Sequence, residues 1–212
     1  MNLLAFDTST EVMAIGIAAG GRRFTTTAPG GAAASATLLP GIEALLAQAG
    51  LAFGDLDIIA FGRGPGAFTG LRTSCAVAQG LGFGLALPLL AIDSLLVVAE
   101  DARLQASVAD ADAELAVAMD ARMDEVYAAR YRFEAARWQV VDAPVLMSPA
   151  TLEAAWRGTA PDVVAGTALA AFGARVSWPP RAERVEREHD RAAALLRLAE
   201  AAAARGEAVD AA

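Results

Sequence analysis

The chain has 212 residues, of which 56% are hydrophobic and 20% charged, so it can bury a core as one large domain or two lobes. Its 17 basic and 25 acidic residues give a formal net charge of −8, which disfavours electrostatic binding to nucleic acid through overall charge. Every basic residue is arginine. The single cysteine, Cys75, excludes an internal disulfide and fits a reducing compartment.

The sequence favours a cytoplasmic protein with no membrane span. Its start, "MNLLAFDTST", has no basic leader and reaches Asp7 too early for a signal peptide. Residues 73–92 carry no charge and are nominally long enough to cross a bilayer. Because glycines lie in the middle of this stretch and Pro88 splits it, we expect a buried helix followed by a short buried strand.

The first hundred residues predict a mixed sheet with helices packed on it. Alternating and apolar runs predict three consecutive strands at 2–6, 12–18 and 22–27. Leucine and isoleucine at helical spacing predict a helix at 35–49. Further along the chain we expect a strand at 57–61, a helix at 68–85, a strand at 89–92 and a helix capped by Asp93 or Ser94.

The second half restarts in a similar way. It predicts a strand at 114–120, a returning strand at 125–133, a helix starting near Pro149, a strand at 162–166 and an alanine-rich helix at 190–205. "LLAFDTSTEV" and "AVAMDARMDEV" each contain an apolar strand, an aspartate, a short turn and Glu-Val, which suggests two related lobes. We therefore expect lobes at 1–100 and 101–212, with the last helix available to pack back on the first lobe.

Catalytic residue types are scarce. His189 is the only histidine and lies in the charged run "RAERVEREHDR", which favours a solvated residue over a general base. One histidine and one cysteine cannot make a zinc or iron cluster, and no Gly-x-Ser-x-Gly elbow is present. Cys75 lies among small apolar residues, which is typical of a structural thiol. We predict no catalytic residue and no metal site.

The glycine-rich stretch "FGRGPGAFTGLR", residues 61–72, looks like a phosphate-binding loop but lacks the lysine that a Walker loop requires. The dinucleotide pattern fails as well, because Arg63 and Pro65 lie inside the turn and no acidic residue completes it. An anion held by free N–H groups at the following helix start remains an alternative. We interpret the loop as a structural turn from strand to helix.

The helix after this loop carries a stripe of small residues at every fourth position. The stripe consists of Gly66, Gly70, Ser74, Ala78 and Gly82. Such a face lets another helix approach closely, so we expect it to receive a partner helix. The alternative is that it packs on the protein's own sheet or first helix.

Four segments together give the chain a family resemblance. "FDTST", "GRGPGAFTGLR", "GLGFGLALPLLAIDSL" and "MDARMDEVYAARY" resemble the TsaB (YeaZ) family over about the first 150 residues. The resemblance implies the actin-like, sugar-kinase-like ATPase fold, with two lobes that each have a mixed sheet and flanking helices. One departure is Ala34, which replaces a histidine found before "LLP" in many relatives.

The actin-like fold offers one strand-turn-strand phosphate clamp in each lobe, with an aspartate that directs the metal. By resemblance, Asp7, Thr8 and Ser9 form an intact first clamp. In the second clamp, at Asp120, bulky Arg122 and Met123 stand where small residues would let backbone amides approach phosphate. "VVAGTA" (163–168) resembles a nucleoside-binding loop with a single glycine. We expect no cofactor to be bound tightly by this chain alone.

The resemblance implies an accessory subunit that is not itself an enzyme. Family members bind TsaD and support threonylcarbamoyl transfer to the tRNA adenosine beside the anticodon. A TsaE-type ATPase joins the assembled complex, tRNA is reached only through that complex, and the isolated protein forms a homodimer. Two alternatives stay open: an ATP-dependent enzyme of the same fold, and a peptidase, a name that some relatives have carried.

Overall fold

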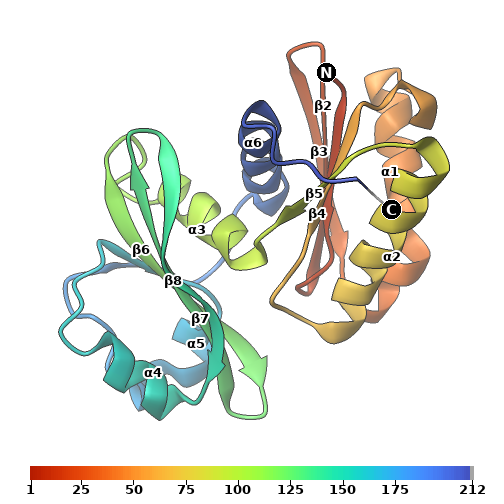
Figure 1. The fold of residues 1–212 in the computed structure, drawn as a ribbon. Coiled ribbons are helices and arrows are strands. Elements are labelled where there is room, and N and C mark those ends of the chain that lie inside the picture. The colour runs from red at the N-terminus through yellow and green to blue at the C-terminus, as the bar shows by residue number, and fades with distance from the viewer. Residues whose placement is uncertain (211–212) are drawn as a thin grey trace. The chain divides into compact units, whose positions relative to one another are not determined.

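Figure 1 shows the computed structural model, which describes residues 1–210. The chain divides into two compact units. Unit 1 contains Met1–Val97 and Asp190–Ala212, and unit 2 contains Val98–His189. The last helix, α6 (Arg191–Ala204), therefore lies in unit 1, on the sheet formed by the first part of the chain.

Unit 1 is built on a five-stranded mixed sheet with the order β3-β2-β1-β4-β5. Its strands are β1 (Leu3–Asp7), β2 (Val12–Ala19), β3 (Arg22–Pro29), β4 (Ile58–Gly62) and β5 (Leu89–Ile92). The first three strands are antiparallel neighbours, whereas β4 pairs with β1 and β5 pairs with β4 in parallel. All five strands were predicted to within two residues at each end.

Helices cover both faces of this sheet. In Figure 1, α1 (Ala34–Ala49) and α2 (Phe68–Leu85) lie on one side and α6 on the other. Successive side chains along β1 point alternately to the two covered faces of the sheet. Leu4 and Phe6 belong to the core cluster shared with α1, so Asp7, the residue after Phe6, is directed to the opposite face, which α6 covers.

Local signals set several helix ends. α1 ends at Gly50, whose φ of 74° is a left-handed cap that glycine adopts readily. α3 (Ser94–Gln105) begins after Asp93, whose carboxylate accepts the N–H groups of Leu95 and Leu96. In the part of the chain that the structure describes, no helix combines the length and the apolar character needed to cross a membrane.

Unit 2 repeats the sheet of unit 1, with the order β10-β9-β6-β7-β8. Its strands are β6 (Ala113–Arg122), β7 (Glu125–Glu134), β8 (Arg137–Met147), β9 (Val163–Ala165) and β10 (Glu183–Val185). Again three antiparallel neighbours are followed by two parallel strands. The helices α4 (Pro149–Trp156) and α5 (Ala168–Phe172) pack on this sheet. The two sheets therefore share one topology, in keeping with the repeated sequence pattern.

Three elements of unit 2 were not predicted. These are β8, α5 and β10. β8 is an edge strand with a largely exposed pattern, and Pro144 interrupts its β-like sequence. α5 spans only five residues and β10 only three, so neither gives a measurable periodicity.

Candidate functional site

The first turn, after β1, is closed by the chain's own side chains. Asp7, Thr8 and Ser9 are all buried. One carboxylate oxygen of Asp7 accepts the Ser9 N–H at 2.6 Å. The other accepts the Ser94 hydroxyl at 2.9 Å and a guanidinium N–H of Arg191 at 2.8 Å. The turn that resembles an intact phosphate clamp in sequence thus contains an internal ion pair.

This ion pair keeps Asp7 ionised. Burial disfavours the charged carboxylate and would raise its pKa. The positive charge of Arg191 and hydrogen bonds from Ser9 and Arg191 outweigh that effect, so the pKa of Asp7 lies below its ordinary value. Arg191 was missed in the sequence because 184 positions separate it from Asp7.

The glycine-rich loop turns the chain from β4 into α2, as expected, and its glycines serve the first turn. A Cβ on Gly62 would overlap the Asp7 carboxylate. A Cβ on Gly66 or Gly70 would overlap the carbonyls of Ser9 and Thr8. These glycines are therefore required for close approach of the loop and α2 to the turn.

The stripe of small residues on α2 faces inward, and the expectation that it receives a partner helix was wrong. Its helical members Gly70, Ser74, Ala78 and Gly82 are buried. Ser74 Oγ lies 2.7 Å from Thr8 Oγ1 and accepts the Thr8 N–H at 3.2 Å, while Thr8 donates to the Gly70 carbonyl. The stripe, with Gly66 against Ser9, holds α2 on its own unit.

The opposite side of α2 is exposed and unusually apolar. Phe68 is 67% exposed and Phe83 is 79% exposed. Between them, Gly80 has nothing within 4 Å of a Cβ built on it, and the same is true of Gly84. The Arg72 guanidinium lies 3.8 Å from the centre of the Phe68 ring. This side of the helix combines aromatic anchors with gaps that a second surface could fill.

The second turn, between β6 and β7, differs from the first in shape. β6 and β7 stay paired as far as Arg122 and Glu125, with an irregularity after Asp120. Arg122, Met123 and Asp124 all have positive φ, at 66°, 52° and 62°. Asp120 accepts the Arg122 N–H at 2.9 Å, and Met123 is 92% exposed. Arg122 and Met123 therefore extend into solvent at the tip of a tight hairpin.

Asp120 is not the structural counterpart of Asp7, although the sequence places them in the same pattern. Asp7 lies beside Gly62, which follows the paired part of the neighbouring parallel strand. The corresponding glycine in unit 2 is Gly166, which lies against the Ala118 carbonyl and the Met119 sulfur. Asp120 comes two positions beyond Ala118 along the chain, so the second turn has no carboxylate in the place of Asp7.

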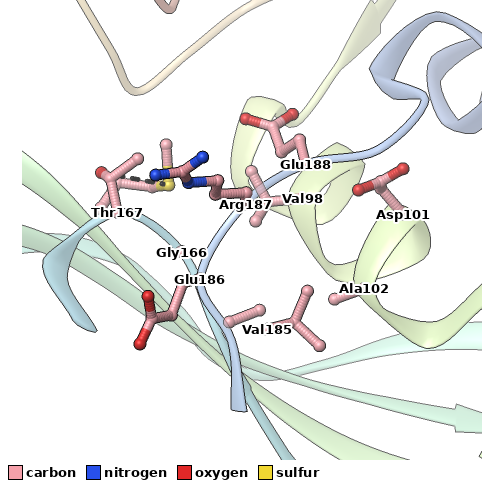
Figure 2. A pocket seen from close by; sticks show the side chains of 11 residues that line it. Val98, Asp101, Ala102, Gly166, Thr167, Val185, Glu186, Arg187 and Glu188 are labelled. Atoms are coloured by element: carbon pink, nitrogen blue, oxygen red, sulfur yellow. Dashed lines mark hydrogen bonds between the residues drawn. The ribbon is translucent and has the colours of Figure 1, made fainter. Parts of the chain in front are cut away.

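A small pocket lies within unit 2 beside the "VVAGTA" loop, as Figure 2 shows. It is bordered by α3, the end of β6, the loop after β9 and the segment that follows β10. The Arg187 side chain extends toward Thr167, whose hydroxyl also accepts the Asp120 N–H at 3.1 Å. The pocket has a volume of about 10 Å³, which corresponds to roughly one water molecule, so it does not accommodate a nucleoside.

The remaining candidate residues behave as structural ones. The His189 side chain is exposed, and its backbone N–H donates to Asp101. Cys75 is a partly buried free thiol on α2. Within residues 1–210, no three His, Cys, Asp or Glu side chains are placed to hold a metal ion. Ala34, at the position of the relatives' histidine, is fully buried.

Comparison with known families gives one family match. The family model described as "TsaD: tRNA N6-adenosine threonylcarbamoyltransferase" matches residues 29–181. The protein from Haemophilus influenzae named "tRNA threonylcarbamoyladenosine biosynthesis protein TsaB" is 39% identical over 127 residues, 60% of this chain and 52% of that protein. The Escherichia coli protein of the same name is 31% identical over 150 residues, 70% of this chain and 63% of that protein. This chain thus spans between half and two thirds of these relatives.

Solved structures extend the match over nearly the whole chain. A structure described as YeaZ from Pseudomonas aeruginosa is 36% identical, with a TM-score of 0.86, and the match covers 99% of this chain and 95% of that one. Another structure from that organism is described as similar to the peptidase YeaZ and has a TM-score of 0.87. An inorganic polyphosphate/ATP-glucomannokinase from Arthrobacter is only 12% identical, but its TM-score of 0.50 over 94% of this chain indicates the same fold. The expected sugar-kinase-like fold is confirmed.

Proposed function

The chain belongs to the family that the TsaD model describes, on its TsaB (YeaZ) branch, and we propose that it acts in threonylcarbamoyladenosine biosynthesis on tRNA. In this proposal it is an accessory subunit in the cytoplasm that binds TsaD. It supports threonylcarbamoyl transfer to the adenosine beside the anticodon without carrying out the transfer. The relatives' names support the pathway, and the state of the two turns supports the accessory role.

The observation that supports an accessory role most directly is the closed first turn. A nucleotide-hydrolysing site needs an accessible carboxylate and backbone N–H groups that are free to bind phosphate. Here the Asp7 carboxylate is paired with Arg191, and the Ser9 N–H is donated to Asp7 itself. At the second turn, the side chain beside Gly166 is that of Met119 and not a carboxylate. Both features support an accessory role.

The competing proposal is an ATP-dependent enzyme, which the likeness in fold to a glucomannokinase favours. A titration of the isolated chain with ATP and Mg²⁺, followed by calorimetry, separates the two. We expect no binding in the micromolar range, because reaching Asp7 would require breaking its pair with Arg191. A micromolar nucleotide site in the isolated chain would favour the enzyme.

We place the TsaD contact on the exposed side of α2 together with the neighbouring outer side of α1. Phe68 and Phe83 provide aromatic anchors, and Leu39 of α1 is 43% exposed. The isolated chain would form a homodimer through the same face, so that the two assemblies exclude each other. In the assembled complex a TsaE-type ATPase joins, and tRNA is reached through the complex.

The pathway is tested by depleting the protein in cells and quantifying tRNA nucleosides by mass spectrometry. Threonylcarbamoyladenosine is expected to disappear while unrelated modified nucleosides keep their levels. An unchanged level of threonylcarbamoyladenosine would remove the basis for the proposal.

The contact surface is tested with Phe83→Asp, measured for TsaD association by ultracentrifugation. A central aromatic anchor typically contributes ~2 kcal/mol or more, so we expect association to weaken roughly 30-fold or more. The control is Val140→Asp, which adds the same charge at a valine that is 59% exposed on β8. If both variants bind TsaD like the wild type, the contact lies elsewhere.

A further inference from the structure

Arg191 is the largest fully buried side chain in the described residues, and it carries a positive charge. It is the first residue of α6, directly after the cap residue Asp190. A buried charge is unfavourable unless it is paired and hydrogen-bonded. The groups around its guanidinium therefore have to provide a negative charge and hydrogen-bond acceptors.

Oxygen atoms from separate segments converge on one nitrogen of this guanidinium. Arg191 Nη2 lies 2.8 Å from Asp7 Oδ2 and 3.0 Å from Ser9 Oγ. The Ser94 carbonyl is 3.5 Å away. These oxygens come from the end of β1, the turn after it and the start of α3, all within unit 1. The same nitrogen thus links three segments to the start of α6.

The oxygen atoms are themselves held in place. The second Asp7 oxygen accepts the Ser9 N–H, which fixes the carboxylate relative to the turn. The Ser94 hydroxyl donates to Asp7 and accepts the Gly64 N–H at 3.1 Å. Gly62 leaves the space that the carboxylate needs. A preorganised anionic cavity of this kind should persist when the cation that fills it is no longer attached to the chain.

We propose that the cavity formed by Asp7, Ser9 and Ser94 is a cation site that takes one nitrogen of a guanidinium group, and that Arg191 fills it from within the chain. Because the cation is covalently attached, the first turn closes without a metal or any other ligand. A variant in which the side chain at position 191 is shortened to alanine should therefore bind free guanidinium in the same place. The test uses the isolated chain, so its result is independent of the pathway and partner proposed above.

The test compares the thermal unfolding of Arg191→Ala with and without 10 mM guanidinium chloride. Removing one partner of a buried ion pair is strongly destabilising, and we expect the melting temperature to fall by roughly 10 °C. Guanidinium should restore at least half of that loss, because a ligand that binds only the folded state raises its stability. Sodium chloride and urea at equal concentration should have no such effect.

Two control variants define the site. Arg197→Ala removes an exposed arginine from the same helix and should show neither the loss nor the gain with guanidinium. The double variant Asp7→Asn with Arg191→Ala removes the anion that would hold the ion, so guanidinium should not stabilise it. Stabilisation of Arg191→Ala but of neither control supports the site.

Several results would overturn the proposal. One is a melting temperature of Arg191→Ala that guanidinium leaves unchanged, and another is an equal gain in the double variant. A third is recovery with Mg²⁺ in the absence of any effect of guanidinium. If Arg191→Ala is recovered only unfolded, it is refolded from urea with and without guanidinium, and a yield that does not rise counts against the site.

Discussion

The hairpins that open the two sheets have the same topology but end in different turns. In unit 1 the pairing of β1 with β2 stops at Asp7 and Ala14, and residues 8–11 form the turn between the two strands. α2, α3 and α6 each hydrogen-bond to that turn or to its aspartate. In unit 2 the pairing continues to Arg122 and Glu125 and leaves only a tight tip. Strand order has been retained between the halves, whereas the chemistry at the strand ends has not.

The two turns differ in whether their side chains are buried or face solvent. The first turn directs the polar groups of Asp7, Thr8 and Ser9 inward, where they hydrogen-bond within their own unit. The tip of the second hairpin instead exposes Met123 to solvent. Fold and site are thus separable, as is common when one architecture supports many activities.

The largest expected effect is that of Asp7→Asn. This substitution leaves Arg191 buried without its carboxylate, and we expect a loss of about 3–5 kcal/mol in the free energy of unfolding. The same substitution at the second turn, Asp120→Asn, removes a 3.9 Å ion pair with the exposed Arg122, while an amide oxygen can still accept the Arg122 N–H, so the change should stay within about 0.5 kcal/mol. Urea unfolding of both variants measures the difference. Similar losses would mean that the two turns contribute alike.

The next effect comes from the helix that covers the first turn. A Cβ at Gly70 would overlap the Thr8 carbonyl, so Gly70→Ala should overpack the contact and cost ~1–3 kcal/mol. Gly80→Ala lies on the same helix with open space around it and should stabilise the chain by up to ~1 kcal/mol through helix propensity. Thermal unfolding followed by circular dichroism shows which variant is destabilised and which is stabilised. Equal behaviour would show that α2 does not rest on the turn.

Acid should act on the first turn through Asp7. Its folded pKa is depressed, so its charged form adds stability above the unfolded pKa of about 3.9, and this stability is lost as the pH falls through the lower folded value. Between pH 5 and pH 3 the wild type should therefore lose stability more steeply than Asp7→Asn. Unfolding free energies across this range provide the measurement. Parallel slopes for the two proteins would indicate that Asp7 does not couple to folding.

The strands and helices of unit 1 could be predicted from the sequence because their apolar residues follow clear periods. The interpretation of the aspartates could not, because it depends on which residue lies beside the glycine of the neighbouring strand. Asp7 and Asp120 each follow an apolar strand in the sequence, and the register of β4 and β9 shows that they lie at different places beside the neighbouring strand. The stripe on α2 was ambiguous for a similar reason. Small residues permit close packing but do not identify the surface that approaches, which here is the Thr8–Ser9 backbone.

The smallest effect concerns the tip of the second hairpin. Met123 has a φ of 52°, a left-handed conformation that costs an ordinary residue roughly 1–2 kcal/mol and glycine almost nothing. Since its side chain is 92% exposed, little packing is lost on removal. Met123→Gly should therefore stabilise the chain, by about 0.5–1 kcal/mol after the greater freedom of glycine in the unfolded chain is counted. In the first turn, Thr8→Gly should do the opposite, because Thr8 Oγ1 is hydrogen-bonded to Gly70 and lies 2.7 Å from Ser74 Oγ. Chemical unfolding of the two variants gives both signs, and a destabilising Met123→Gly would mean that the methionine makes contacts that its exposure does not suggest.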